Sequence, residues 1–263
     1  MDRATELRIG LRNANHVWDF RANNDLAEAK SGSWRFYPHK NFPACAEVTV
    51  SGQEFPKTII IDYGEDCFNR WGNQKTGVIT ITISDAMINE GAVYEVNFDN
   101  VTFGRRSINK TSTVTNEGIN DNGNWVISYV SLSTVSYGDS LVVERDFIQE
   151  KEWINGFGTR DPFDDQFFKT GGGTITVNKD LVFERNIIDA LHIDRACRFI
   201  LSGVVEISKG DESMTIDYGE GDCDNIAIVT KDGISEEIEL SKCRFRDGFM
   251  KRHRHFYRLK GWW

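Results

Sequence analysis

Hydrophobic and polar residues alternate along most of this chain. β-branched and aromatic residues recur at every second position in segments such as 78–83, 93–98 and 126–130, a pattern typical of strands with one buried face. Turns rich in Gly, Asn and Asp separate the segments at intervals of about ten residues; the clearest is the hairpin signal at 120–124. Such intervals are too short for crossover helices, so the pattern predicts a mainly antiparallel sheet.

The segment 141–154 is harder to assign because apolar residues occupy both parities and charges interrupt each. Val143, Phe147 and Trp153 share one parity. A strand of this length would span about 45 Å and would fit an extended ladder between two units; a helix is the competing assignment. Gly156 and Gly158 on one side and the glycines 171–173 on the other bracket the acidic segment 161–165, which predicts a loop or a link there.

One segment occurs twice. Ile-Asp-Tyr-Gly ends an apolar strand at 61–64 and again at 216–219, and an acidic turn follows each copy. A cysteine precedes and another follows each motif, as Cys45 and Cys67 in the first copy and Cys197 and Cys223 in the second. Two related β units in tandem are the simplest interpretation.

We therefore predict an all-β protein of two tandem, related antiparallel β units, arranged as a sandwich or as one extended twisted sheet. The predicted divisions are a polar N-terminal lead-in (1–35), a first β unit (36–155), a second β unit (156–245) and a basic-aromatic tail (246–263). The lead-in contains one short helical candidate at 24–30.

The placement of the cysteines in the repeat predicts the disulfides Cys45–Cys67 and Cys197–Cys223, with Cys243 unpaired. Each bridge would close a short loop and stabilise the fold by about 3 kcal/mol. The alternative is five buried thiols in a reducing compartment. The absence of a CxxC pair argues against a zinc ribbon or a thioredoxin-type site.

Composition indicates a globular protein, because 40% of the 263 residues are hydrophobic, enough for one large core or two cores of about 100 residues. The charge is unevenly spread. The segment from Lys242 to the end contributes +7 to the net charge of −9, so the remaining body carries −16. An acidic body argues against a nucleic-acid-binding surface.

The chain resembles a family of secreted Bacteroidetes proteins that are regarded as lipoproteins. The similarity covers about residues 40–242 and runs through 55–58, both Ile-Asp-Tyr-Gly strands, 69–77, 113–116, 152–157 and 218–225. That family usually has Asp-Phe-Gly where this chain has Tyr63 and Tyr218. The resemblance supplies no catalytic residues. It implies export to the periplasm, outer membrane or cell surface, often through a lipid on a cysteine upstream of this sequence, and an oxidising compartment.

The acidic turns are a candidate calcium site, and no other cofactor is expected. Ca²⁺ prefers several oxygen ligands that a turn can bring together. The candidate ligands are Asp217, Glu220, Asp222 and Asp224, with Asp62, Glu65 and Asp66 in the first unit. The alternative is purely structural, since Asp also favours such turns by hydrogen-bonding its own backbone.

The expected function is that of a non-catalytic envelope or surface module that binds a glycan or an envelope protein. No nucleophile elbow, Walker loop or HExxH motif is present. Trp71, Trp125 and Trp153 are the candidate binding aromatics, although strand aromatics are often core residues. The alternatives are a purely structural envelope component and a glycan hydrolase with paired carboxylates, for which Asp161, Asp164 and Asp165 are the best set.

The basic-aromatic tail allows two interpretations. Its cations and tryptophans match the chemistry that meets anionic lipid headgroups. Alternatively, its aromatics cover the sheet while its cations neutralise the acidic body.

Overall fold

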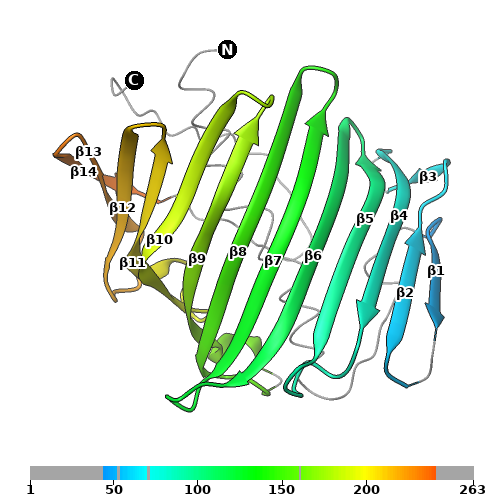
Figure 1. Cartoon of the computed structure of the whole chain (residues 1–263), viewed down its shortest axis with the longest axis horizontal. Helices are drawn as coiled ribbons and strands as arrows, with labels where there is room; N and C mark the ends of the chain where they lie inside the picture. The colour runs from blue at the N-terminus through cyan, green and yellow to red at the C-terminus, as the bar shows by residue number, and fades with distance from the viewer. Residues whose placement is uncertain (1–43, 52–53, 70–71, 160, 241–263) are drawn as a thin grey trace.

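The computed structural model describes residues 44–51, 54–69, 72–159 and 161–240. These residues form a single open antiparallel sheet of fourteen strands (Figure 1). The one helical element among them is the 3₁₀ turn η1 (Pro162–Asp164). The all-β prediction is confirmed. The lead-in, its helical candidate and the tail lie outside the described residues.

The strands lengthen toward the middle of the sheet (Figure 1). Their bounds are β1 (Glu47–Ser51), β2 (Lys57–Asp62), β3 (Cys67–Phe68), β4 (Gln74–Ile83), β5 (Val93–Phe103), β6 (Arg106–Ile119), β7 (Trp125–Tyr137), β8 (Leu141–Asn155), β9 (Gln166–Val177), β10 (Leu181–Asp194), β11 (Ile200–Lys209), β12 (Glu212–Glu220), β13 (Ile226–Lys231) and β14 (Ile234–Glu239).

Each strand pairs with the next strand in sequence, except that β2 pairs with β4 and the short β3 pairs separately with β4. Strands β1 and β14 therefore lie at opposite ends of the sheet (Figure 1). Of the two predicted arrangements, the structure has the extended sheet. The order follows from the short polar turns, which allow a strand to pair only with its sequence neighbours.

The predicted boundary between the two units does not interrupt the sheet. Residues 141–155 form the single strand β8, as the sequence pattern favoured over a helix. Strand β8 pairs with β9 across the boundary. The predicted link at 161–165 is present between β8 and β9, but the bracketing glycines at 171–173 lie inside β9. A Cβ on Gly173 would lie 2.0 Å from the carbonyl oxygen of Asp146 on β8. The glycines therefore permit close approach of neighbouring backbones.

The apolar core lies on one face of the sheet. Its buried strand residues alternate along each strand and pair across the ladders, as Ile59 does with Ile81 and Val143 with Val177. They form clusters at the β2–β5 end (Ile59, Ile61, Ile79, Ile81, Ile83), in the centre (Val114, Ile127, Trp153, Phe167; Val143, Phe147, Ile175, Phe183) and at the β10–β13 end (Leu191, Val205, Met214, Ile216, Ala227). Neighbouring strands thus supply each cluster.

Close approach of the backbones at Gly173 generates the first prediction. Gly173→Ala should lower the free energy of unfolding by about 2 kcal/mol or more, because the added methyl group overlaps the β8 backbone. Urea denaturation followed by circular dichroism measures the loss. Thr174→Ala, at the exposed neighbouring position, is the matched control and should change stability by less than about 0.5 kcal/mol. Equal stability of Gly173→Ala and the parent protein would contradict this account of β9.

Candidate functional site

The charges of the central sheet are sorted by sign. Within β5–β11 every Lys and Arg lies on the face that carries the apolar core, and every Asp and Glu lies on the other face. The basic face carries Arg106, Lys110, Arg145, Lys151, Lys169, Arg185 and Lys209. The acidic face carries Glu95, Asp99, Glu117, Glu144, Asp146, Glu150, Glu152, Glu184, Asp189, Asp194 and Glu206.

The sorting has a physical cause in the aromatic rings of the core face. Ring faces attract cations and repel anions, and the long stems of Lys and Arg pack like apolar side chains. Lys151 Nζ lies 4.7 Å from the ring centroid of Phe167 and 4.9 Å from that of Tyr129. Lys75 on β4 lies 4.8 Å from Phe103 in the same way. A carboxylate at such a position would be buried without favourable electrostatics.

Arg145 departs from this pattern of ring contacts. It is 2% exposed and lies on β8 between Val143 and Phe147, opposite Ser133 of β7 and Ile175 of β9. Burial lowers the pKa of its guanidinium, and a hydrogen bond with Tyr137 acts in the opposite direction. Its Nε and Nη2 atoms are buried and have no hydrogen-bond partner within the part of the chain that the structure describes. Buried donors of this kind are rare and costly.

Other cations surround Arg145 on the basic face. Lys110 pairs across β6 and β7 with Ser133, the same residue that faces Arg145, and burial lowers the pKa of Lys110 to about 8. Arg185 is 6% exposed and faces Gly173 on β9. Lys151 and Lys169 are direct cross-strand partners. Like charges so placed repel each other, and all of these cations lie on the face that carries the apolar core.

The acidic face has an exposed aliphatic centre. Val130, Leu132 and Ile148 are 48%, 57% and 65% exposed. Val130 and Ile148 are cross-strand partners, and Leu132 follows on β7 opposite Asp146. Thr111, Thr113 and Thr174 flank them on β6 and β9. The result is a small apolar patch bordered by hydroxyl groups and carboxylates.

The sequence repeat corresponds to two disulfide-closed hairpins near the two ends of the sheet. Cys45–Cys67 flanks the hairpin β1–β2, and Cys197–Cys223 flanks β11–β12. Both predicted pairs are present in the structure. Cys243 lies outside the described residues.

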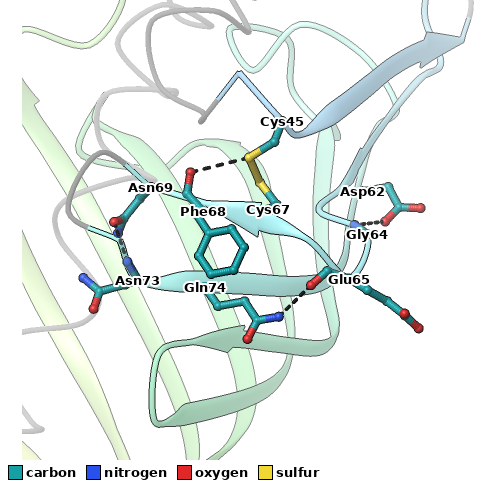
Figure 2. The surroundings of a disulfide bond; sticks show 9 residues. All are labelled: Cys45, Asp62, Gly64, Glu65, Cys67, Phe68, Asn69, Asn73 and Gln74. Carbon is teal, nitrogen blue, oxygen red and sulfur yellow. Dashed lines mark hydrogen bonds between the residues drawn. A yellow bond between two sulfur atoms is a disulfide. The ribbon is translucent and has the colours of Figure 1, made fainter.

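Both turns have the same local geometry. Gly64 N donates to Asp62 Oδ1 at 2.8 Å, and Gly219 N donates to Asp217 Oδ1 at 2.9 Å. Figure 2 shows the first turn, where Gln74 Nε2 also donates to the backbone oxygen of Glu65. Tyr63 and Tyr218, the next residues of the motif, are buried in the core. The repeated residues therefore build the hairpin ends.

The structure does not assemble the predicted calcium site. Asp217 and Asp224 each accept a hydrogen bond from a backbone amide two residues later. Among the described residues, no group of three or more His, Cys, Asp or Glu side chains is arranged to hold a metal ion. The structural interpretation of these turns accounts for Asp217 and Asp224; Glu220 and Asp222 are exposed beside them.

The candidate binding aromatics are not a solvent-facing platform. Trp153 is 3% exposed and packs against Phe167 at 4.8 Å between ring centroids. Trp125 is half-buried, stacks on Phe157 at 4.8 Å and packs against the central cluster that contains Trp153. Trp71 lies outside the described residues. The alternation therefore places Trp125 and Trp153 on the core face of the sheet.

The three carboxylates considered for glycan hydrolysis have local roles around η1. Asp161 Oδ1 accepts from Phe163 N at 2.9 Å and caps the turn. Asp164 Oδ1 accepts from Thr159 Oγ1 at 2.8 Å. Asp165 is 2% exposed, and its backbone oxygen accepts from Arg195 N. These contacts fix the link between β8 and β9.

Glu152 fastens the 120–124 hairpin to β8. Its Oε1 accepts hydrogen bonds from the side-chain amides of Asn120 and Asn124 at 2.8 Å and of Asn122 at 3.3 Å. Those from Asn124 and Asn120 are the main cause of the lowered pKa of this carboxyl group. The arrangement is structural, since all three amides donate to the same carboxylate oxygen of Glu152.

Comparisons with known proteins gave no match with a family model, a curated protein or a solved structure. The described residues also contain no helix long and apolar enough to cross a membrane. Functional inference therefore depends on the two faces of the sheet. Sequence reasoning missed both faces, although a signal was present: in 141–155, Arg145 and Lys151 share the parity of Trp153, while Asp146 and Glu150 share the other.

The Glu152 hydrogen bonds predict a pH-dependent stability. A depressed folded pKa means that ionised Glu152 stabilises the fold above its unfolded pKa of about 4.5, and that this contribution is lost as pH falls through the folded pKa. Glu152→Gln should therefore lower the free energy of unfolding at pH 7, and its deficit should shrink below about pH 4.5. Urea denaturation from pH 7 to pH 3 measures both.

Glu150→Gln, on the same strand and exposed, is the matched control and should show no comparable deficit at pH 7. A Glu152→Gln deficit that stays constant down to pH 3 would mean that charge is not involved.

Non-reducing peptide mapping tests the covalent framework. It should recover the linked pairs Cys45–Cys67 and Cys197–Cys223. Three or more alkylatable thiols in the native, unreduced protein would contradict it. Reduction should lower stability by about 3 kcal/mol for each bridge, since each closes a loop of comparable length.

Proposed function

We propose that this protein is an exported, non-catalytic module of the cell envelope that binds a protein partner with a basic surface through its acidic sheet face. The observation that carries the proposal is the exposed aliphatic centre of that face, Val130, Leu132 and Ile148, within a field of carboxylates. Apolar centres with polar rims are typical of protein interfaces, and contiguous exposed apolar groups often mark them.

Charge determines the chemistry of the partner. Asp146 and Glu150 flank Ile148 on β8, and Glu95, Glu184 and Glu206 extend the acidic field to both sides. A basic surface on the partner would be steered to this face and would fix its orientation. The flat ladder of β6–β9 suits a broad contact better than a small ligand.

The observations favour a protein over a glycan as the partner. Glycan-binding sheets present aromatic rings to solvent, whereas Trp125 and Trp153 pack in the core. The hydrolase alternative loses its best residues, because Asp161 and Asp164 hydrogen-bond within the β8–β9 link.

Two observations support export. The disulfides Cys45–Cys67 and Cys197–Cys223 suit an oxidising compartment. The proposed resemblance to secreted Bacteroidetes proteins agrees with such a location, in the periplasm, outer membrane or cell surface.

The proposal predicts the effect of one surface substitution. Proteins retained from an envelope extract by the parent protein should include a basic partner that, once purified, binds Ile148→Ser about tenfold more weakly, because the central apolar contact is lost. Affinity should also fall as salt is raised. Ile234→Ser on β14, an isoleucine of similar exposure at the end of the sheet, is the matched control and should bind like the parent. Isothermal titration calorimetry measures the affinity of the partner for the parent protein, Ile148→Ser and Ile234→Ser.

Two results would contradict the proposal. One is a partner whose affinity falls equally in Ile148→Ser and Ile234→Ser. The other is glycan hydrolysis that one carboxylate substitution, such as Asp164→Asn, abolishes in a screen run beside a glycan array. Binding of neutral glycans with the same affinity by Ile148→Ser and the parent protein would place the binding site outside the acidic face.

A further inference from the structure

The basic face contains a donor pair that no described residue uses. Arg145 is 2% exposed, and its Nε and Nη2 atoms have no hydrogen-bond partner. These two atoms form the side-on edge of the guanidinium, where two parallel N–H groups point in the same direction. That edge matches the spacing of two oxygens of a carboxylate, sulfate or phosphate.

The surroundings of Arg145 would leave this charge uncompensated. Val143, Phe147 and Ile175 are apolar neighbours along and across the strands, and the carboxylates of β5–β11 all lie on the opposite face. The hydrogen bond with Tyr137 engages a phenol hydroxyl group and brings no carboxylate to the guanidinium. A buried cation without an anion is costly, whereas a bidentate anion both neutralises it and satisfies its donors.

Residues on β7 and β10 add to the attraction. Ser133 lies directly opposite Arg145, and Ser131 is the next residue on the same face; both are buried. The Ser133 hydroxyl group is suited to donate to an oxyanion, whereas Ser131 Oγ donates to the backbone oxygen of Thr111 at 3.4 Å. Lys110 faces Ser133 from β6, and Arg185 lies on β10 opposite Gly173. The other positive charges of this region therefore come from two strands, β6 and β10.

We propose that Arg145 is the centre of an oxyanion-binding site on the basic face, which holds one carboxylate, sulfate or phosphate group side-on through Nε and Nη2. Ser131 and Ser133 border the site, and Lys110 and Arg185 supply long-range attraction. The site lies on the opposite face from the proposed partner surface, so each succeeds or fails independently of the other.

Calorimetric titration of the full chain with sulfate, phosphate and acetate, at constant ionic strength in chloride, tests the proposal. The parent protein should bind at least one of these anions saturably. Arg145→Lys keeps the charge but loses the two parallel N–H donors of Nε and Nη2, and it should weaken binding about tenfold. Arg145→Met should abolish binding. Arg105→Met, which removes the same charge from an exposed turn, is the control and should leave binding unchanged.

A second measurement separates an anion site from a structural arginine. Without added oxyanion, Arg145→Met should be at least as stable to urea as the parent, because it replaces a buried unpaired charge with an apolar chain of similar length. A strong loss of stability in Arg145→Met together with no oxyanion binding by the parent would overturn the proposal. Binding that Arg145→Lys and Arg145→Met leave unchanged would overturn it as well.

Two further titrations identify the source of the oxyanion. Free galacturonate and a galacturonate oligomer carry the same carboxylate, with and without a chain. Equal affinities identify a free small anion as the ligand. Tighter binding of the oligomer, which Arg145→Lys weakens and Arg145→Met abolishes, identifies an acidic group carried on a larger molecule. Both results support the site, since in each case the carboxylate binds through Arg145 Nε and Nη2.

Discussion

The structure depends on alternation within one continuous antiparallel sheet. Because each strand pairs only with its neighbours, a residue's parity determines its face from β5 to β11, except where β-bulges shift the register in β5, β6 and β10. A shift of one residue in any strand would exchange its apolar and acidic sets, so that carboxylates such as Asp146 and Glu150 would enter the core. This cost fixes the register more firmly than the turns do, and it accounts for the separation of the two signs of charge.

The aromatic content of the core decides which charges it tolerates. Lys75 and Lys151 lie over ring faces, where cation–π attraction and stem packing offset part of the cost of burial. Carboxylates have no such partner and remain on the solvent-facing side. One face therefore combines the core with the cations, and the other combines solvent exposure with negative charge. The two proposed binding surfaces, for a basic protein and for an oxyanion, are consequences of the same separation.

Disulfides and hairpin ties act at the periphery of this sheet. Cys45–Cys67 and Cys197–Cys223 close hairpins near the two ends, where a strand has fewer neighbours to hold it. Glu152 and its three asparagines fasten a central hairpin to β8. These contacts hold the ends of the hairpins in place, where strand pairing alone gives less support. The acidic motif that repeats in the sequence thus serves the fold and carries no metal chemistry in the described residues.

The sequence by itself determined the strands, their antiparallel order and the disulfide pairs, because these depend on local alternation, short turns and a repeat. Only the tertiary structure decided that Gly171–Gly173 lie within a strand and that the two units form one sheet, since close backbone approach between β8 and β9 is a property of paired strands. It also decided that Trp125 and Trp153 are core residues and that Arg145 is buried with two unused donors. Parity in one strand assigns a residue to a face, but the register of seven strands is needed to show which residues share that face.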